Sequence, residues 1–436
     1  MTEQLGRIER RESTVGVIGL GYVGLPLVLL FQEAGFPVIG FDLDEEKVKN
    51  LSSGSSYIRH ISAEGVKRAF GRGDARATTD FSLLDECDAI IICVPTPLGS
   101  HREPDLSFVR TTAQTIATHL RIGQLVVLES TTYPGTTREE LLPRFEARGL
   151  NCGSDYFLAF SPEREDPGNE RFNTKNIPKV VGGIDEPSLQ LAVALYRSVI
   201  DRIVPVSSPE VAESSKLLEN IFRAVNIALV NELKVLFERM GINIWEVIEA
   251  AKTKPFGFMP FYPGPGLGGH CIPLDPFYLT WKAAEYGTWA RFIELAGEIN
   301  TGMPRYVVDR TVEAINRQGQ SIVGAKVLVL GLSYKPDIDD DRESPSFELI
   351  ETLQERGATV AYCDPYVPFA RKGRKHDLGL QSVPCTADEF AKYDAVLVST
   401  SHSQFKEPSL YERTKLVIDT RNILRTGAHG PPIVRA

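Results

Sequence analysis

One cysteine lies in a segment that regular secondary structure cannot accommodate. Cys271 belongs to residues 264–276, whose sequence GPGLGGHCIPLDP is dominated by glycine and proline. These residue types exclude an ordinary helix or a central strand, so we expect the thiol to be displayed on a loop. The N-terminus of the same chain carries a dinucleotide-binding pattern. A hydride acceptor combined with a nucleophilic thiol could oxidise an alcohol to an acid through a thioester.

The dinucleotide pattern includes the elements that must position it. Residues 15–18 predict a buried strand, and the apolar periodicity of residues 25–34 predicts a helix. The turn between them consists of Gly19, Leu20, Gly21, Tyr22, Val23 and Gly24. Its three glycines permit a tight turn, close approach of a pyrophosphate and packing of the helix on the strand. The N-terminus of that helix favours the phosphate charge.

The acid at the end of the next strand indicates which cofactor is preferred. Residues 37–41 end at Asp42, which would accept hydrogen bonds from an adenosine ribose and repel a 2′-phosphate, so NAD is preferred to NADP. Further strands are expected at 89–94 and 125–128. The segments that follow them contain Pro95, Thr96 and Thr131. Because ligands bind at the carboxyl ends of parallel strands in an open α/β sheet, these residues are candidates for cofactor binding.

The C-terminal third of the chain repeats this plan. Four segments echo the strands of the first part: 326–330, 358–364, 393–398 and 415–419. The second copy lacks the later fingerprint glycines and carries an acidic insertion at residues 336–345. We therefore expect it to have lost dinucleotide binding, while its strand ends remain suited to another phosphate-bearing ligand.

The middle of the chain is predicted to be helical. Residues 209–240 read as one long helix without internal glycine or proline, and residues 245–251 and 281–300 as further helices. Lys216 and Asn220 share one face of the long helix. That helix must bury its apolar face, and a second copy of the chain is a natural partner, so we expect a homodimer or a higher homo-oligomer.

These elements together predict an α/β fold class. We expect two Rossmann-like, doubly wound parallel-sheet lobes joined by a long central helix and a small helical middle domain. The expected domains are an NAD-binding domain at 1–208, a central helical domain at 209–302 with the cysteine loop and the dimer interface, and a second Rossmann-like domain at 303–436.

Composition narrows the choice of partners and compartment. The 436 residues carry a formal net charge of -9, which argues against nucleic acid and anionic membranes as partners. The charged first residues and the lack of a long apolar run predict a cytoplasmic protein. The six cysteines show neither paired spacing nor clustering with histidine, so neither a metal site nor a disulfide framework is expected. Cys93 and Cys363 are interpreted as small buried hydrophobes.

The motifs resemble, in order and over nearly the whole chain, the UDP-glucose/UDP-mannose dehydrogenase family of nucleotide-sugar 6-dehydrogenases. They are GLGYVGLP at 19–26, ST at 130–131, SPE at 161–163, Lys216 with Asn220, and GGHCIP at 268–273 with Asp275. Segments 254–263 and 274–281 are most similar to the UDP-N-acetylglucosamine branch. The UDP-N-acetylmannosamine and UDP-glucose branches are the nearest alternatives. In the UDP-glucose branch a second glutamate follows at an offset that Pro167 occupies here.

The resemblance implies a four-electron oxidation of a UDP-sugar that uses two NAD per turnover. Cys271 would attack the retained aldehyde to give a thiohemiacetal, and oxidation would then yield a thioester that is hydrolysed. A nearby cation such as Lys216 favours the thiolate. Lys216, Asn220 and a water held by Thr131 and Asp275 would stabilise or deprotonate the oxygen species. By spacing alone, Lys216 would be read as a solvated helix lysine.

The resemblance also assigns Glu163 as a general acid/base or water-orienting group, although the residue pattern alone fits a surface loop acid. Glu165 is left open as a substitute for the second glutamate. His270 is expected to shape the loop by hydrogen bonding and is not assigned to catalysis. The Ser161-Pro162-Glu163 run follows an apolar strand, which places Glu163 at a ligand-facing strand end.

Substrate binding is expected to involve cations of the second lobe and aromatic residues near the cysteine loop. The candidates are Lys216, Asn220, Phe261, Tyr262, Gly268, Lys335, Arg342 and Arg421. Arg342 could instead neutralise the neighbouring acidic run, and the two aromatic side chains could instead pack in a core.

Two other functions fit the lobe–helix–lobe plan. One is a two-electron β-hydroxyacid or sugar-phosphate dehydrogenase, which needs no thiol. The other is a nucleotide sensor built on a retired dehydrogenase. The favoured function is oxidation of UDP-N-acetylglucosamine to UDP-N-acetylglucosaminuronate, and the resemblance suggests supply of a surface polysaccharide precursor. The exact sugar depends on fine pocket shape that the sequence does not determine.

Overall fold

The computed structural model describes residues 1–58, 61–71, 73–99, 103–164, 171–269, 272–373, 376–424 and 430–436. Cys271, His270 and Glu165 lie outside the described residues. The chain divides into two units. The N-terminal unit comprises Met1–Glu219 and Phe277–Thr288, and the C-terminal unit comprises Asn220–Pro276 and Trp289–Ala436. The segment predicted as a central domain thus contributes residues to both units.

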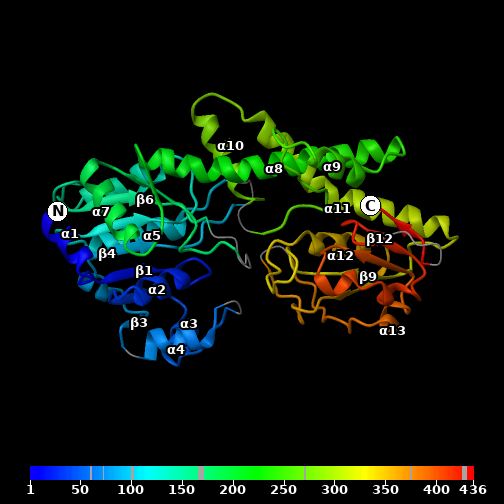
Figure 1. Ribbon diagram of the computed structural model, residues 1–436, viewed down its shortest axis with the longest axis horizontal. Helices are drawn as coiled ribbons and strands as arrows, with labels where there is room; N and C mark the ends of the chain where they lie inside the picture. The colour runs from blue at the N-terminus through cyan, green and yellow to red at the C-terminus, as the bar shows by residue number, and fades with distance from the viewer. Residues whose placement is uncertain are drawn as a thin grey trace. The chain divides into compact units, whose positions relative to one another are not determined.

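The N-terminal unit is built on an eight-stranded sheet of order β3-β2-β1-β4-β5-β6-β7-β8. Its strands are β1 Val15–Ile18, β2 Val38–Phe41, β3 Ala75–Thr78, β4 Ala89–Ile92, β5 Leu125–Leu128, β6 Phe157–Phe160, β7 Lys179–Gly183 and β8 Ile203–Val206. All neighbouring strands run parallel except β6 and β7. The first six strands have the Rossmann order, which confirms the predicted α/β lobe (Figure 1).

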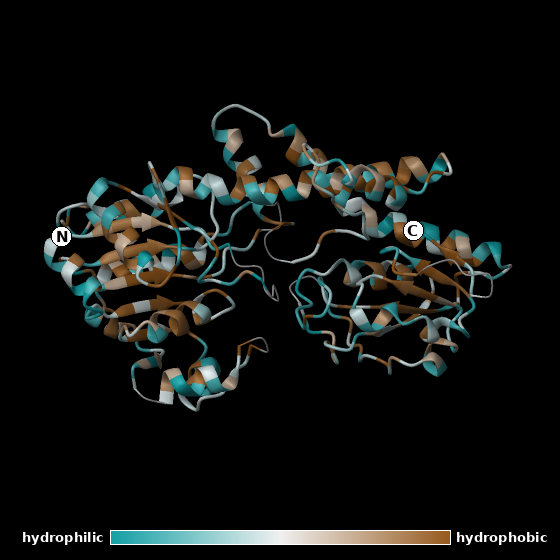
Figure 2. Cartoon of the chain, viewed as in Figure 1, coloured by the Kyte–Doolittle hydropathy of each residue, from teal (hydrophilic) through white to brown (hydrophobic). Residues whose placement is uncertain are grey.

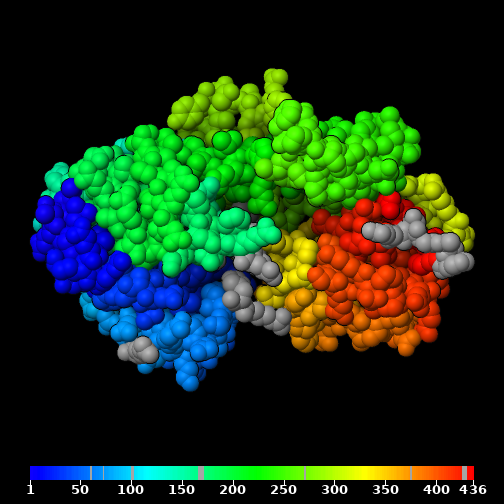
Figure 3. Space-filling view, in the orientation of Figure 1, coloured from blue at the N-terminus to red at the C-terminus, as the bar shows by residue number. Residues whose placement is uncertain are grey.

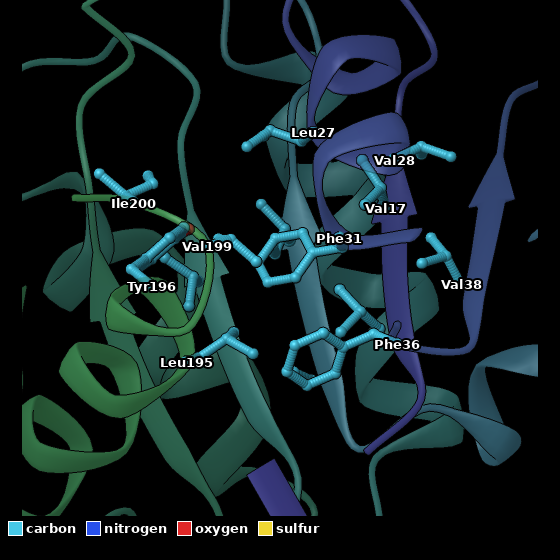
Figure 4. Close-up of a cluster of buried hydrophobic side chains, with 14 of the residues drawn as sticks. Val17, Leu27, Val28, Phe31, Phe36, Val38, Leu195, Tyr196, Val199 and Ile200 are labelled. Atoms are coloured by element: carbon cyan, nitrogen blue, oxygen red, sulfur yellow. The ribbon is translucent and has the colours of Figure 1, made fainter. Parts of the chain in front are cut away.

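The core of this unit explains why these short segments are strands. Strands β1, β2, β4, β5 and β6 are buried along their whole length, as apolar runs covered on both faces should be. Strands of both units are mainly brown in the hydropathy view (Figure 2). Phe31 and Tyr196 approach each other over this sheet, with ring centroids 6.4 Å apart (Figure 4).

Helices surround the sheet of the N-terminal unit. They are α1 Thr2–Glu9, α2 Gly24–Glu33, α3 Glu45–Ser52, α4 Ala63–Gly71, η1 Phe81–Glu86, α5 Ser107–His119, η2 Thr137–Leu141, α6 Leu142–Glu146 and α7 Glu186–Arg197. Helix α2 begins at the last glycine of the predicted turn. Its start differs by one residue from the prediction.

The C-terminal unit holds a parallel five-stranded sheet of order β10-β9-β11-β12-β13. The strands are β9 Lys326–Leu330, β10 Thr359–Cys363, β11 Ala395–Val398, β12 Val417–Asp419 and β13 Ile433–Val434. The helices are α9 Ile244–Lys252, α11 Arg291–Arg317, α12 Pro345–Glu355, α13 Ala387–Phe390, η3 Ser403–Lys406 and η4 Pro408–Tyr411. This is the second common doubly wound order, so the predicted repeat of an α/β lobe is confirmed.

The long helix is present as predicted, but the third helical segment is not. Helix α8 spans Pro209–Arg239 and contributes residues to both units. The single helix predicted at 281–300 is wrong: α10 covers Asp275–Glu285, and α11 begins only at Arg291. Gly287 has φ +67° between them, a left-handed conformation that ends a helix. No helix within the described ranges is both long and apolar enough to cross a membrane.

Cysteine pairing also departs from the sequence prediction. Cys363, at the end of β10, forms a disulfide with Cys385. The expectation of no disulfide is therefore wrong, although Cys363 is buried as predicted. The two residues are 22 apart in sequence and are brought together by the loop that follows the strand, with Cα atoms 6.0 Å apart. Such a pair leaves no spacing motif in the sequence.

Candidate active site

The turn after β1 has the geometry that a dinucleotide needs. Gly19 has φ +95°, and a Cβ there would lie 2.6 Å from the Cys93 carbonyl oxygen. A Cβ on Gly24 would lie 1.9 Å from the Gly19 carbonyl oxygen, so α2 packs tightly on the turn. A Cβ on Gly21 would meet nothing within 4 Å. The open side of Gly21 therefore leaves room for a pyrophosphate, and the other two glycines maintain the turn.

The acid at the end of β2 is fixed beside this turn. Asp42 accepts a hydrogen bond from the Leu20 amide at 2.8 Å and pairs with the Lys47 ammonium at 3.1 Å. Its carboxylate is thus held at the strand end where an adenosine ribose is recognised. Tyr22 and Val23 of the turn are partly buried. These positions fit NAD as the bound group.

Two further candidates follow β4 at the same edge of the sheet. Pro95 is exposed and Thr96 is partly buried. The Thr96 carbonyl accepts a hydrogen bond from the Tyr278 hydroxyl. The segment after β4 is therefore anchored through its backbone, and the Thr96 side chain is not needed for that anchor.

A buried carboxylate ties the loop after β5 to α8. Thr131 is partly buried in this loop. Glu213 of α8 accepts hydrogen bonds from the Gly135 amide at 2.6 Å, the Thr137 amide at 3.0 Å and the Thr137 hydroxyl at 2.7 Å. Burial raises the pKa of Glu213 to about 7, although these three donors oppose the rise. Glu213 was not predicted from the sequence, because its partners lie far away in the chain.

The loop after β6 is tied to the same helix nearly two turns further on. Arg164 donates to Glu219 of α8 at 2.7 and 3.2 Å and to the Pro178 carbonyl at 2.6 Å. Its backbone amide donates to Glu163 at 2.9 Å. The Glu163 side chain is only 10% exposed. Glu163 is therefore a largely buried acid at the ligand edge and not the surface loop acid that its pattern alone would suggest.

The start of α8 thus lies against two candidate loops of the N-terminal unit. Lys216 is on this part of the helix, between the two glutamates that hold those loops, and is 7% exposed. The reading of Lys216 as a solvated lysine does not hold. Thr131, Glu163 and Lys216 are carried by segments that are bonded to one another within this unit.

The C-terminal unit brings together two other predicted residues. The Asn220 amide donates to the Asp275 carboxylate at 2.6 Å, and both side chains are buried. Asn231, which was not predicted from the sequence, accepts a hydrogen bond from the Gly264 amide at 3.0 Å. Asn220 and Asn231 are eleven residues apart, which is three helical turns and so one face of α8. That spacing is the signal that could have identified Asn231.

These two asparagines anchor both ends of the glycine-rich segment on α8. Within the segment, a Cβ on Gly268 would lie 2.7 Å from the Tyr334 Cβ, and one on Gly269 would lie 3.0 Å from the Tyr334 ring. Gly264 lies against the Arg421 guanidinium, where a Cβ would come within 2.3 Å. The glycines therefore permit a close approach to the strand ends of the second sheet.

The candidate cations of the second lobe differ in their surroundings. Arg421 follows β12 and donates to the Ser399 carbonyl at 2.7 Å. Burial lowers the pKa of Arg421 to about 10, so the side chain remains charged at neutral pH. Arg342 makes a two-pronged ion pair with Asp340, which matches the alternative in which it neutralises the acidic run. Lys335 is partly buried after β9.

The closing acid of the second lobe is occupied by the protein itself. Asp364 accepts hydrogen bonds from the Leu332 and Ser333 amides at 2.6 and 2.9 Å, and His402 lies 3.1 Å away. Burial opposes its ionisation, but the His402 hydrogen bond and the backbone donors lower the pKa of Asp364 below its usual value. The protein itself thus engages this carboxylate, and the loss of dinucleotide binding stays a prediction.

The two candidate aromatic residues have different partners. Phe261 packs edge to face on Phe222, with centroids 5.7 Å apart, and adjoins the core of α8 and α9. The Tyr262 side chain is exposed, and its hydroxyl donates a hydrogen bond to the Glu249 carboxylate at 2.5 Å. The alternative of core packing describes Phe261 better than Tyr262.

Comparison with known proteins places these features in one family. Three models of the UDP-glucose/GDP-mannose dehydrogenase family match the chain: the NAD binding domain at residues 13–200, the central domain at 210–302 and the UDP binding domain at 328–426. The match to the first of these indicates NAD as the cofactor.

Individual relatives cover nearly the whole chain. It is 36% identical over 398 residues to a UDP-N-acetyl-D-glucosamine 6-dehydrogenase of Pseudomonas aeruginosa, covering 91% of this chain and 92% of the relative. It is 34% identical over 423 residues to an NDP-N-acetyl-D-galactosaminuronic acid dehydrogenase of Ralstonia nicotianae, covering 94% and 96%. The structure of a UDP-D-ManNAc dehydrogenase of Pyrococcus horikoshii superposes with TM-score 0.87 at 34% identity, covering 96% and 98%. The chain therefore belongs to the UDP-glucose/GDP-mannose dehydrogenase family of nucleotide-sugar dehydrogenases.

Proposed function

We propose that the protein oxidises the C6 alcohol of UDP-N-acetylglucosamine to the carboxylate of UDP-N-acetylglucosaminuronate. The observation that carries this proposal is the hydrogen bond between Asn220 and Asp275 at 2.6 Å. It joins Asn220 of α8 to Asp275 at the end of the cysteine loop. These two residues are 55 apart in sequence. An amide donor and a carboxylate at one end of that loop are suited to binding a reacting oxygen and a water.

The chemistry proceeds in two oxidations and a hydrolysis. NAD, when bound, accepts one hydride in each oxidation. The first oxidation converts the alcohol to an aldehyde, with loss of the hydroxyl proton to a base. The Cys271 thiolate then adds to the aldehyde carbon, and the carbonyl oxygen takes a proton to complete a thiohemiacetal. Loss of the second hydride and the hydroxyl proton gives a thioester, and attack by water breaks the carbon–sulfur bond and restores the thiolate.

The described residues have complementary roles in these steps. Lys216 and Asn220 stabilise negative charge on the substrate oxygen. Thr131 and Asp275 hold the hydrolytic water, and Glu163 exchanges protons with it. The buried setting of Lys216 and Glu163 supports these roles, because charge interactions strengthen where water is excluded.

The choice of sugar rests on the motifs and on relatives. The segments on either side of the cysteine loop are most similar to the UDP-N-acetylglucosamine branch, and a relative with that activity is 36% identical. UDP-N-acetylmannosamine and UDP-glucose are the alternative substrates. Arg421 and Lys335 follow strands of the second sheet and are the cations proposed to bind the UDP diphosphate.

A substrate panel with one active-site variant tests this function. NADH formation is measured with UDP-glucose and with the N-acetylated UDP-sugars of glucosamine, galactosamine and mannosamine. The highest kcat/KM is expected for UDP-N-acetylglucosamine. Cys271→Ala should lose acid formation while its NAD affinity stays within about twofold of wild type. Equal rates across the panel contradict the sugar assignment, and undiminished turnover by Cys271→Ala contradicts the thioester.

We also propose that the protein forms a homodimer through α8. Apolar side chains recur along this helix at four- and seven-residue spacings and remain exposed: Val211, Leu218, Phe222, Leu229 and Leu236, followed by Met240 just after its end. Residues of α8, green in the space-filling view, reach the molecular surface (Figure 3). A continuous apolar stripe on a 31-residue helix is costly in water, and an identical stripe is a partner of matching length and chemistry.

A further inference from the structure

A buried ion pair lies at the ligand edge of the N-terminal sheet. Lys179 begins β7, and its ammonium is 2.9 Å from the carboxylate of Glu129, which follows β5. The side chains are 6% and 0% exposed. The Tyr196 hydroxyl donates to the other oxygen of Glu129, and the Lys179 ammonium lies 5.0 Å from the centre of the Tyr196 ring. A pair so deeply buried is costly unless its geometry is well satisfied.

The same ammonium also faces Glu163. The distance from the Lys179 ammonium to the Glu163 carboxylate is 3.8 Å. One buried cation is therefore shared between Glu129, which is sealed inside the protein, and Glu163, which lies at the ligand edge. If Lys179 only neutralised Glu129, its ammonium would not also need to lie near Glu163.

The backbone around Lys179 holds this arrangement in place. The Arg164 backbone N–H donates a hydrogen bond to the Glu163 carboxylate. Its guanidinium donates another to the carbonyl of Pro178, the residue before Lys179. The loop that carries Glu163 is thus bonded to the start of the strand that carries Lys179. Both links come from Arg164, so this one residue holds the Glu163 loop close to Lys179.

The other titratable groups that face Lys179 do not compete for its charge. Burial raises the pKa of Cys93 and of Tyr196 well above their ordinary values, so both stay neutral. Burial opposes the charge on Lys179, but Glu129 and Glu163 raise its pKa above the usual value. Burial raises the pKa of Glu129 and Lys179 lowers it. Because both of its oxygens accept hydrogen bonds, we favour the ionised form.

We propose that Lys179 is a positioning residue that keeps the Glu163 carboxylate ionised and directed at the substrate, while Glu129 limits the strength of that pull. The proposal rests on the proposed function, because it takes Glu163 to exchange a proton during turnover. A cation this close favours the charged form of a carboxylate, whereas a neighbouring carboxylate disfavours it. Removing each partner should therefore move the acid limb of the pH profile in opposite directions.

Three variants of the full-length protein test this assignment. Lys179→Met should raise the pH at which kcat/KM falls on the acid side by roughly 1 to 3 pH units. Glu129→Gln, which keeps an acceptor for Tyr196, should lower it. Lys179→Arg should keep the acid limb near that of wild type. A shift in the same direction for Lys179→Met and Glu129→Gln, or none in a folded Lys179→Met protein, overturns the proposal. If Lys179→Met does not fold, Glu129→Gln alone decides by the direction of its shift.

A second readout separates this proposal from the proposed function. In protein labelled with ¹³C at glutamate carboxyl groups and saturated with NAD, the signal absent from Glu163→Gln identifies Glu163. Its titration should move upward in Lys179→Met and downward in Glu129→Gln. If wild type oxidises no UDP-sugar, the function fails while this titration still tests the role of Lys179. Normal turnover with an unmoved titration refutes only the role of Lys179.

Discussion

At the scale of single residues, Asp42 should decide between NAD and NADP. Its carboxylate is held by the Leu20 amide and Lys47 at the end of β2. Asp42→Ala removes the ribose acceptor and the charge that repels a 2′-phosphate, so KM for NAD should rise roughly tenfold or more and NADP discrimination should weaken. Lys47→Met, which leaves the carboxylate in place, should keep the preference. An unchanged NAD to NADP ratio of kcat/KM in folded Asp42→Ala contradicts this role.

Glu213 should make stability depend on pH. Burial raises its folded-state pKa from 4.5 to about 7, so the stabilising contribution is complete below pH 4.5 and is lost as pH rises through 7. The stability of wild type relative to Glu213→Gln should therefore fall by about 3 kcal/mol over that range. Melting temperatures of both proteins, measured from pH 4.5 to 8, test this. A difference that stays constant with pH means that Glu213 does not titrate there.

The residues found from sequence differ in kind from those that were missed. Asp42 and the turn glycines could be predicted because their roles follow from local order along the chain. Glu213 and Lys179 could not, because their partners lie 76 and 50 residues away in sequence. From the sequence alone, a charged side chain is expected to lie at the surface. Only the fold shows that these are buried.

At the scale of elements, the turn between β1 and α2 separates two uses of glycine. Gly24→Ala should destabilise the protein, because its Cβ would collide with the Gly19 carbonyl at 1.9 Å. Gly21→Ala should fold normally, because its Cβ meets nothing within 4 Å, yet lose NAD affinity by blocking the pyrophosphate. Melting temperature and NAD titration distinguish them. Wild-type NAD affinity in Gly21→Ala shows that the open side does not receive the phosphates.

The helices show where sequence patterns succeed and fail. Helix α8 was predicted to within one residue at its end, because no glycine or proline interrupts its 31 residues. The helix predicted at 281–300 failed because Gly287, in a left-handed conformation, lies between the end of α10 and the start of α11. Helix α11 also passes through Pro304, a residue that normally signals a helix end.

At the scale of the whole molecule, the apolar stripe of α8 should control assembly. Leu229 is 51% exposed near the middle of the stripe, and Leu229→Glu places a charge there. Sedimentation velocity should show a dimer for wild type and a monomer for Leu229→Glu. Val323→Glu, at an exposed apolar residue away from α8, should remain dimeric. A monomeric wild type at micromolar concentration excludes this interface.

The two sheets were predictable in outline but not in extent. The fingerprint and its repeat predict the buried inner strands, which are continuous apolar runs. Strands β3, β7, β8 and β13 were not predicted. Strand β8 is short, contains a proline and is not fully buried, so it lacks the apolar pattern of an inner strand. The pairing of Cys363 with Cys385 was missed for the related reason that it depends on tertiary contact.

The central claim is a four-electron oxidation by one chain, and the number of NADH molecules formed per UDP-sugar tests it most directly. With limiting UDP-N-acetylglucosamine and excess NAD, absorbance gives NADH and chromatography gives the acid. Two NADH for each uronate, with no released aldehyde, is the predicted result. One NADH per sugar, with an aldehyde or ketone as the only product, would contradict it.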